Sequence, residues 1–141
     1  MRLSHYFLRL TLAVTITCGT AAVHAQDKAP TFIAKETGIY RVDAKGQRTL
    51  ILKAKSSEVF AATSLTISPN HAWALIDYLP RNPGAGRVEE VRVLISLKGG
   101  TRIEQDAFKR KYGEWMDELA DWAPDAPATI ELDNGKKIRL R

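Results

Sequence analysis

The sequence predicts a mainly β fold (α+β): an antiparallel sheet of about six to eight strands, one C-terminal amphipathic helix packed on it, and a final β-hairpin. Three observations support this prediction. Short segments rich in β-branched and aromatic residues alternate with turn sequences from Thr31 onward. One stretch, residues 104–122, repeats apolar side chains at helical spacing. The last residues form two short apolar runs around Asn134 and Gly135.

Residues 1–25 precede this domain and have the three parts of a secretory signal. Arg2 and Arg9 stand before a short apolar run, Leu10–Cys18, and small residues then end at Ala25. A membrane-spanning helix needs about 20 apolar residues, roughly twice this run. We therefore expect a cleaved signal peptide rather than a transmembrane anchor, and a periplasmic location for the mature chain.

Composition limits the chemistry that the mature chain can perform. Cleavage after Ala25 leaves 141 − 25 = 116 residues, enough for one domain with its own core. Two of the 21 basic residues and none of the 16 acidic ones are lost, so the net charge is 19 − 16 = +3, too mild for a nucleic-acid partner. Thr17 precedes Cys18 where lipoproteins have a small residue, so lipid attachment is not expected. His71 is then the one histidine and no cysteine remains, which argues against a metal site and against any cofactor.

After a flexible lead-in at residues 26–30, residues 31–141 are expected to form a single β-rich domain. Asp43–Gly46, Ser68–His71 and Pro80–Gly86 have the composition of turns between strands. The expected strands lie near Thr31–Glu36, Ile39–Asp43, Arg48–Ala54, Val59–Ile67, Ala72–Leu79 and Arg87–Leu97.

The predicted helix covers Glu104–Trp122. Its apolar stripe has successive spacings of 4, 3, 4 and 3, and it consists of Phe108, Tyr112, Trp115, Leu119 and Trp122. Gly113 weakens the prediction of an unbroken helix by about 1 kcal/mol relative to alanine.

Acidic residues near the end of this predicted helix oppose its macrodipole, so a basic group is expected to face them. The acidic residues are Asp117, Glu118 and Asp121, and the internal basic candidates are Lys137, Arg139 and Arg141. A basic partner protein is the alternative.

The final hairpin has a preferred register. A three-residue loop, Asp133–Gly135 with a left-handed glycine, pairs Ile130 with Ile138 and Glu131 with Lys137. This register makes one face apolar and places an ion pair on the other.

No catalytic constellation is evident. His71 is the only imidazole of the mature chain, and Ser68–His71 has the composition of a tight turn rather than of a catalytic triad. Glu89 and Glu90 are neighbours on an expected strand, so they are predicted to point to opposite faces and not to act as a pair. We therefore do not expect an enzyme.

Two segments resemble the blade hairpins of TolB-type β-propellers. In residues 65–76 a strand ends in Ser68-Pro69-Asn70-His71, where the family has Ser-Pro-Asp-Gly, and residues 39–46 are similar to the inner hairpin of a blade. His71 takes the place of the family's glycine. The mature chain is long enough for at most about three blades, which excludes a closed propeller. The resemblance implies an open, propeller-like domain of the kind known among periplasmic immunity proteins that block cell-wall amidases.

These observations favour a non-enzymatic periplasmic binding protein, an inhibitor or immunity-type protein acting on an envelope-directed enzyme. The expected partner is a protein of the cell envelope. The Pro80–Gly86 loop is the candidate contact surface because surface loops often carry function. The candidate partner-binding residues are Tyr78, Arg81, Asn82, Arg87 and His71. Two alternatives stay open: a small envelope hydrolase that uses carboxylates, and an accessory or structural module of an envelope complex.

Overall fold

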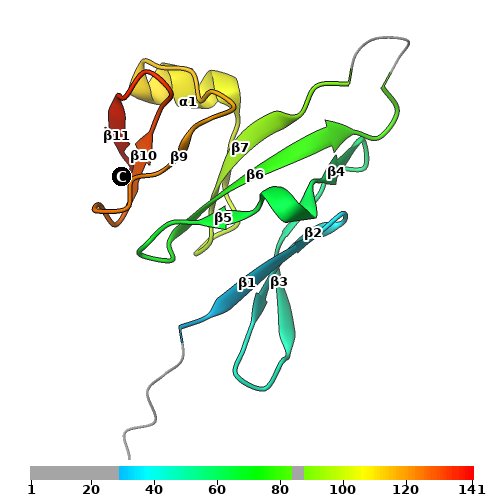
Figure 1. The fold of residues 1–141 in the computed structure, drawn as a ribbon. Helices are drawn as coiled ribbons and strands as arrows, with labels where there is room; N and C mark the ends of the chain where they lie inside the picture. Colours follow the sequence, from blue (N-terminus) through cyan, green and yellow to red (C-terminus); the bar gives the residue numbers. More distant parts are fainter. Residues whose placement is uncertain (1–28, 84–87) are drawn as a thin grey trace, which may run out of the picture.

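The computed structural model describes residues 29–83 and 88–141 and is mainly β (Figure 1). The paired strands of these residues run antiparallel, so the predicted antiparallel β architecture is confirmed. The prediction of one sheet of six to eight strands is wrong, because the described residues contain eleven strands in three sheets and one α-helix. No helix in the described part of the chain has the length and apolar character that crossing a bilayer requires.

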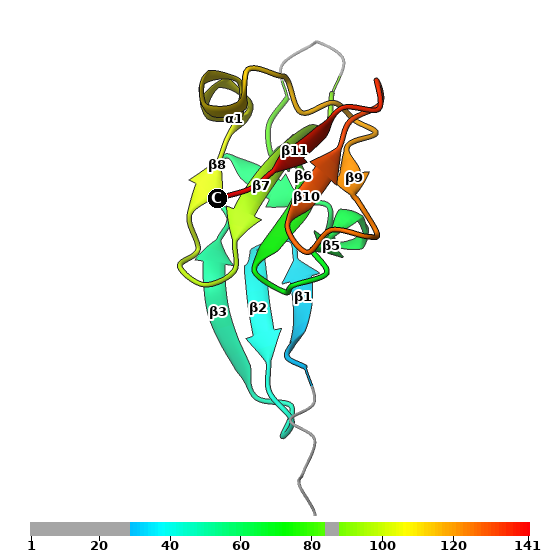
Figure 2. The same ribbon diagram turned by 90° about the vertical axis from the view of Figure 1, so that its left-hand side faces the viewer.

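The N-terminal sheet is a meander of three strands, β1 (Thr31–Lys35), β2 (Gly38–Val42) and β3 (Arg48–Lys53). Gly38 is fixed by close packing, since a Cβ atom there would lie 2.6 Å from the Leu52 carbonyl oxygen. Both ribbon views show the β2–β3 hairpin extending beyond the rest of the fold (Figures 1 and 2).

The central sheet is built around β6, its longest strand. Its strands are β4 (Glu58–Phe60), β5 (Thr66–Ile67), β6 (Trp73–Pro80), β7 (Val91–Ser96) and β8 (Arg102–Ile103). One side of β6 pairs with β7, and the other pairs with β4 and β5 along its two halves.

A short 3₁₀ turn, Ala62–Ser64, separates β4 from β5, so the predicted continuous strand Val59–Ile67 is wrong. At this turn, the backbone groups of Asp77 on β6 still have hydrogen-bond partners. The Ala61 N–H donates to the Asp77 carbonyl, and the Asp77 N–H donates to the Ser64 hydroxyl at 2.8 Å. A side chain here replaces a backbone partner of the ladder, which composition alone does not reveal.

The C-terminal part consists of α1 (Gln105–Tyr112) and a small sheet of β9 (Asp121–Trp122), β10 (Thr129–Glu131) and β11 (Lys137–Arg139). Its hairpin confirms the predicted register, with Ile130 opposite Ile138 and Glu131 opposite Lys137. Gly135 has a φ of +78°, as the three-residue loop requires.

The central sheet is buried on both faces, which makes a layered molecule (Figure 2). Leu75 and Leu94 face a cluster formed with α1 and the C-terminal sheet. Ile76 and Val93 face a second cluster, formed with the N-terminal sheet. Burial on both faces explains why β6 and β7 are nearly continuous apolar runs rather than alternating ones.

The predicted helix Glu104–Trp122 is wrong in its second half, because α1 ends at Tyr112. Gly113 adopts a left-handed φ of +82° and its N–H donates to the Lys109 carbonyl, a common helix C-cap. Beyond it, Met116 is buried, Trp115 is exposed and Trp122 lies in β9. The residues of the predicted apolar stripe therefore lie in α1, in the loop that follows it and in β9.

Candidate binding site

The residues proposed from the sequence as a contact surface lie at opposite ends of β6. His71 precedes this strand, whereas Arg81 and Asn82 follow it. Eight extended residues span about 25 Å, so His71 does not share a surface with the loop. Arg87 and residues 84–86 lie outside the described residues.

Tyr78 is half-buried and takes part in internal packing. The Arg102 guanidinium lies 5.2 Å from the centroid of its ring and forms an ion pair with Glu58. The Arg102 and Glu58 side chains are only 10% and 4% exposed. Burial, together with the nearby Glu104 carboxylate, raises the pKa of Tyr78. This cluster joins β4 to β8 and is structural.

Arg81 lines a shallow hollow of about 360 Å³ beside the N-terminal sheet, with Lys53 and Lys55 among its neighbours. The Arg81 N–H donates to the Ser57 carbonyl, which fixes the chain where it leaves β6. The Arg81 and Asn82 residues are exposed. This hollow is basic, and its shallowness offers a ligand little enclosed surface.

His71 and Ser68 form a turn, as the sequence predicted. The His71 N–H donates to the Ser68 carbonyl, and the Ser68 hydroxyl donates to Asn70 and accepts from the Trp73 N–H. Ser68 is buried with its hydroxyl engaged, so it is not available as a nucleophile.

A more developed site lies between β7 and the segment after α1. Asp77 on β6 and Arg92 on β7 are opposite each other in register, and both lie on the face of the central sheet that carries Leu75 and Leu94. Arg92 donates from Nε to one carboxylate oxygen of Asp77 at 2.8 Å and from NH2 to the other at 3.0 Å. This is a bidentate pair, which fixes the direction of the guanidinium.

The same guanidinium holds residues 117–120, which we call the clamped loop. Arg92 NH1 donates to the carbonyls of Glu118 and Ala120, on either side of Leu119. The Asp117 carboxylate accepts from the N–H groups of Leu119 and Asp133, each at 3.1 Å. The backbone around Leu119 is therefore fixed from both sides.

Arg92, rather than the last strand, also supplies the cation near the acidic residues of this segment. Hydrogen bonding to Asp77 raises the pKa of Arg92, burial opposes this, and the charges of Asp77, Asp121 and Asp117 add to the increase. Lys137 pairs instead with Glu131 at 3.4 Å. The expected pairing with Lys137, Arg139 and Arg141 is wrong, because no ion pair among the described residues joins these acids to the last strand.

The clamped loop presents its apolar side chain to solvent. Leu119 is 69% exposed, although it lies between Glu118 and the buried Ala120. Trp115 is 53% exposed. Val88, which lies just before β7, is 42% exposed. The Lys109 ammonium lies 5.7 Å from the centroid of the Trp115 ring.

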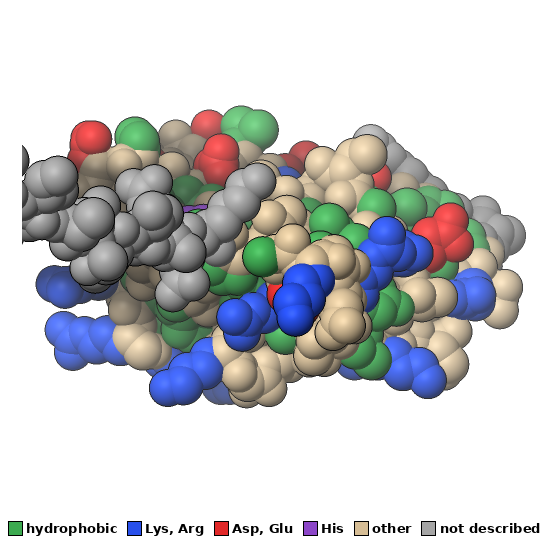
Figure 3. All heavy atoms as spheres, turned by 90° about the horizontal axis from the view of Figure 1, so that it is seen from below, with side chains coloured by type: hydrophobic (Ala, Val, Ile, Leu, Met, Phe, Trp, Pro, Cys, Tyr) green, Lys and Arg blue, Asp and Glu red, His purple; other side chains and the backbone are tan. Residues whose placement is uncertain are grey.

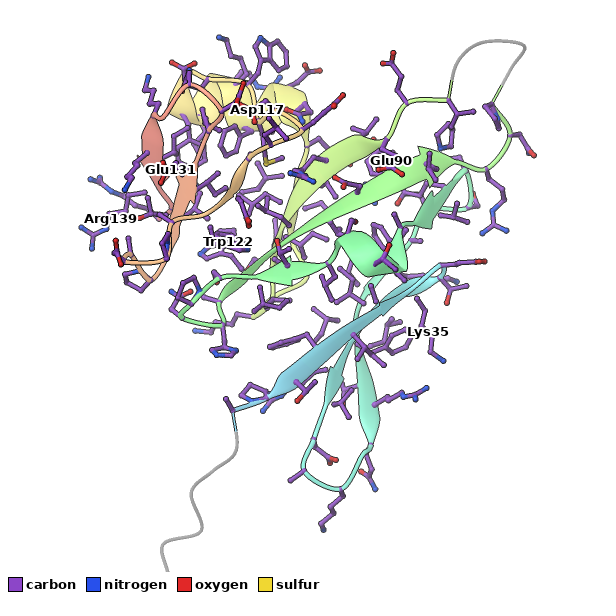
Figure 4. All side chains as sticks on the ribbon, in the orientation of Figure 1. Lys35, Glu90, Asp117, Trp122, Glu131 and Arg139 are labelled. Carbon is purple, nitrogen blue, oxygen red and sulfur yellow. The ribbon has the colours of Figure 1, made fainter. Side chains whose placement is uncertain are left out.

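An acidic hollow of about 490 Å³ lies beside Leu119. It is lined by Asp77, Val88, Glu89, Glu90, Arg92, Glu118 and Leu119. Figure 4 labels Glu90 and Asp117, one on each of the two segments that flank it. Asp77 pairs with Arg92, and Glu89, Glu90 and Glu118 have no ion-pair partner among residues 29–83 and 88–141, so the hollow attracts a cation.

The arrangement corrects the prediction that Glu89 and Glu90 face apart. Strand β7 begins at Val91 rather than Arg87, so these two residues precede the strand and both line the hollow. The alternation of strand side chains does not apply to them.

Among the acidic residues of the hollow, Asp77 has a structural role. Both carboxylate oxygens of Asp77 accept hydrogen bonds from Arg92, which leaves Asp77 no role in proton transfer. Within the described residues, no three acidic or histidine side chains come together as a metal site. The geometry suits binding: a fixed apolar side chain beside a pocket of negative charge.

Comparison with family models, curated proteins and solved structures finds no match to this chain. The resemblance of residues 39–46 and 65–76 to propeller blades therefore stays a prediction.

Proposed function

We propose that this chain is an exported, non-enzymatic binding protein, and that it binds a protein of the cell envelope through Leu119 and the acidic hollow. An inhibitory or immunity-type role towards an envelope-directed enzyme is the form of this function that we favour. The proposed surface replaces the Pro80–Gly86 loop and His71 as the main contact.

The observation that carries this proposal is the fixed backbone around the exposed Leu119. An exposed leucine on a mobile loop loses conformational freedom on binding, whereas a fixed one has already lost it. Arg92 and Asp117 hold the clamped loop through four hydrogen bonds. Protein interfaces have an apolar centre and a polar rim, and Leu119 with the glutamates around it has this arrangement.

Charge favours a partner that presents a basic side chain beside an apolar one. Glu89, Glu90 and Glu118 surround the hollow, and Val88 and Leu119 supply its apolar border. An arginine or lysine of a partner protein that enters the hollow meets carboxylates at its tip and apolar surface along its stem.

Site-specific photo-crosslinking in an exporting cell tests this proposal. A photoreactive phenylalanine analogue at position 119 is expected to give one discrete protein adduct. The matched control carries the same analogue at the exposed Arg139 on β11, and is expected to give none. Equal adducts at both positions, or no adduct at position 119, would contradict the proposal.

A carboxylate hydrolase is the second candidate, because Glu89 and Glu90 line one hollow. It predicts that the purified chain releases soluble fragments from peptidoglycan and that Glu89→Gln or Glu90→Gln abolishes the release. Leu119→Ser separates the two functions, since it removes the binding anchor and leaves these carboxylates in place.

A further inference from the structure

The outward face of the N-terminal sheet carries apolar side chains that take no part in either core. The register places Thr31, Val42 and Arg48 in one row, and Ile33, Tyr40 and Leu50 in the next. The inward face of the same strands supplies Phe32, Ala34, Ile39 and Leu52 to the core. We call the opposite side of this sheet the outer face. Its residues are Thr31, Ile33, Lys35, Tyr40, Val42, Arg48, Leu50 and Lys53.

Leu50 shows how open this face is. It is 49% exposed, and its Cδ1 atom would lie 2.9 Å from a Cβ atom at Gly38, so it lies across the glycine on the outer side. Ile33, Tyr40 and Val42 are partly exposed. Among the described residues, none of these four belongs to a core cluster.

Positive charge surrounds this apolar row. Six of the eight charged side chains between Thr31 and Lys55 are basic. Of these six, Lys55 pairs with Glu104, and Arg41, opposite Phe32, belongs to the inward face. Arg48 stands at one end of the outer face, and Lys35 and Lys53 stand at the other. Figure 3 views this side of the molecule and shows Lys and Arg side chains over it with apolar surface between them. Lys35, labelled in Figure 4, points away from the central sheet.

The acidic residue at the hairpin tip lowers this charge by one and also fixes the turn. The Asp43 carboxylate accepts from the backbone N–H groups of Lys45 and Gln47, each at 2.8 Å, and so holds the tip of the β2–β3 hairpin. Residues 43–50 are all exposed. The hairpin thus presents Lys45 and Arg48 on a fixed turn.

We infer that the outer face binds the surface of an anionic phospholipid bilayer. Apolar and tyrosine side chains enter the interface, while the long lysine and arginine side chains reach the phosphates around them. A second copy of the chain does not suit this face, because two cationic surfaces repel each other. A folded acidic protein suits it less well than a bilayer, since the apolar row lies on an extended sheet face rather than in a pocket.

Vesicle sedimentation tests the inference with the chain from Gln26 to Arg141, which contains every described core residue. The chain is expected to sediment with vesicles of phosphatidylglycerol and phosphatidylcholine, and not with phosphatidylcholine alone. Near 1 M NaCl the screening length falls to about 3 Å, and most of the bound chain should be released.

Two matched double variants locate the charge. Arg48→Gln/Lys53→Gln is expected to weaken binding to the anionic vesicles about 25-fold, about fivefold for each charge near the surface. Arg110→Gln/Arg139→Gln changes the net charge equally on exposed residues of α1 and β11, and is expected to leave binding close to that of the wild type. Leu50→Ser is expected to weaken binding about fivefold through lost apolar contact.

Three results would overturn the inference: equal sedimentation with both kinds of vesicle, equal loss in the two double variants, or no sedimentation with the anionic vesicles. The third result would count against it even where an acidic protein binds the same face. Urea unfolding of each variant checks that the fold is intact. We expect it to be, because Arg48, Leu50 and Lys53 are all exposed. The crosslinking test at position 119 is independent of all these outcomes.

Discussion

His71 holds a backbone conformation that suits glycine better. Its φ is +56°, the only positive φ of a non-glycine residue in the described part of the chain. The left-handed conformation costs an L-residue about 1–2 kcal/mol, although histidine tolerates it better than most. The turn is held by the His71 N–H bond to the Ser68 carbonyl and by the Ser68 hydroxyl, which bonds to Asn70 and to the Trp73 N–H.

We therefore predict that His71→Gly raises the free energy of unfolding by about 0.5 kcal/mol, the relieved strain less the greater entropy of glycine in the unfolded chain. Urea denaturation measures this. His71→Val is the control and is expected to destabilise the fold, because a β-branched residue is strained at this φ. A loss of stability in His71→Gly would show that the imidazole stabilises the turn.

Arg92 is expected to be the residue on which the clamped loop depends. Arg92→Met leaves the buried Asp77 without its partner, and the free energy of unfolding should fall by about 3–5 kcal/mol. In Asp77→Leu/Arg92→Met no unpaired charge remains, so the loss should be smaller by at least about 1 kcal/mol. Urea unfolding of the two variants makes the comparison. A loss in the double variant equal to or greater than that in Arg92→Met would contradict this prediction.

Glu58 makes the stability depend on pH. Burial raises the pKa of its carboxyl, but the Arg102 hydrogen bond, the Lys55 backbone N–H and the charges of both residues outweigh burial and hold the pKa below its usual value of 4.5. A lowered pKa in the folded state means that this stabilisation is present above about pH 4.5 and is lost as the pH falls through the folded-state pKa.

Unfolding measured between about pH 5 and pH 2 should therefore show a loss of stability that Glu58→Gln reduces. Glu89→Gln, at an exposed position, is the control and should retain the slope of the wild type. The same slope in wild type and Glu58→Gln would assign the acid sensitivity to other carboxyls.

The helix α1 ends at Tyr112, and Gly113 is its C-cap. Gly113 has a φ of +82°, and no atom lies within 4 Å of the position that a Cβ would take. Gly113→Ala therefore tests the backbone conformation alone and should cost about 1 kcal/mol in free energy of unfolding. Circular dichroism should show no gain of helix, because Met116 and Ala120 are already fixed in the core. A gain of helix would mean that the sequence pattern of residues 104–122 determines the structure once glycine is removed.

The final hairpin and the helix show which kinds of element could be predicted from the sequence. The final hairpin was predicted to the register because its turn, its apolar pairs and its ion pair are all within ten residues of one another. The second half of the helix was mispredicted because Met116 is buried, and Trp122 partly buried, in a cluster with distant strands, and this packing overrides a local period. The predicted strand Arg87–Leu97 started too early, and the later start of β7 at Val91 brings Glu89 and Glu90 to one hollow.

The candidate site could be predicted from the sequence only in part. Asp77 and Arg92 are charged residues inside two apolar strands, which is a signal that they pair across the sheet. Their register, and the reach of Arg92 to the clamped loop 26 and 28 residues away, come only from the fold. An exposed Leu119 is not distinguishable in sequence from a core position of a helix.

At the scale of the whole molecule, the central sheet separates the two proposed surfaces. The outer face lies beyond the cluster that contains Ile39 and Ile76, whereas the clamped loop belongs to the opposite side, with Ala120 and Leu94. A chain bound to a bilayer through its N-terminal sheet would therefore keep Leu119 and the acidic hollow free for a protein partner.

This separation predicts that the two activities are independent. Arg48→Gln/Lys53→Gln should lose binding to anionic vesicles and retain the crosslink at position 119. Leu119→Ser should retain vesicle binding and, with the photoreactive group moved to Trp115, should lose the crosslink. Both variants alter exposed side chains, so their free energies of unfolding should stay within about 0.5 kcal/mol of the wild type. Loss of both activities in either variant would mean that one surface serves both ligands, because additive behaviour is expected of sites that share no contacts.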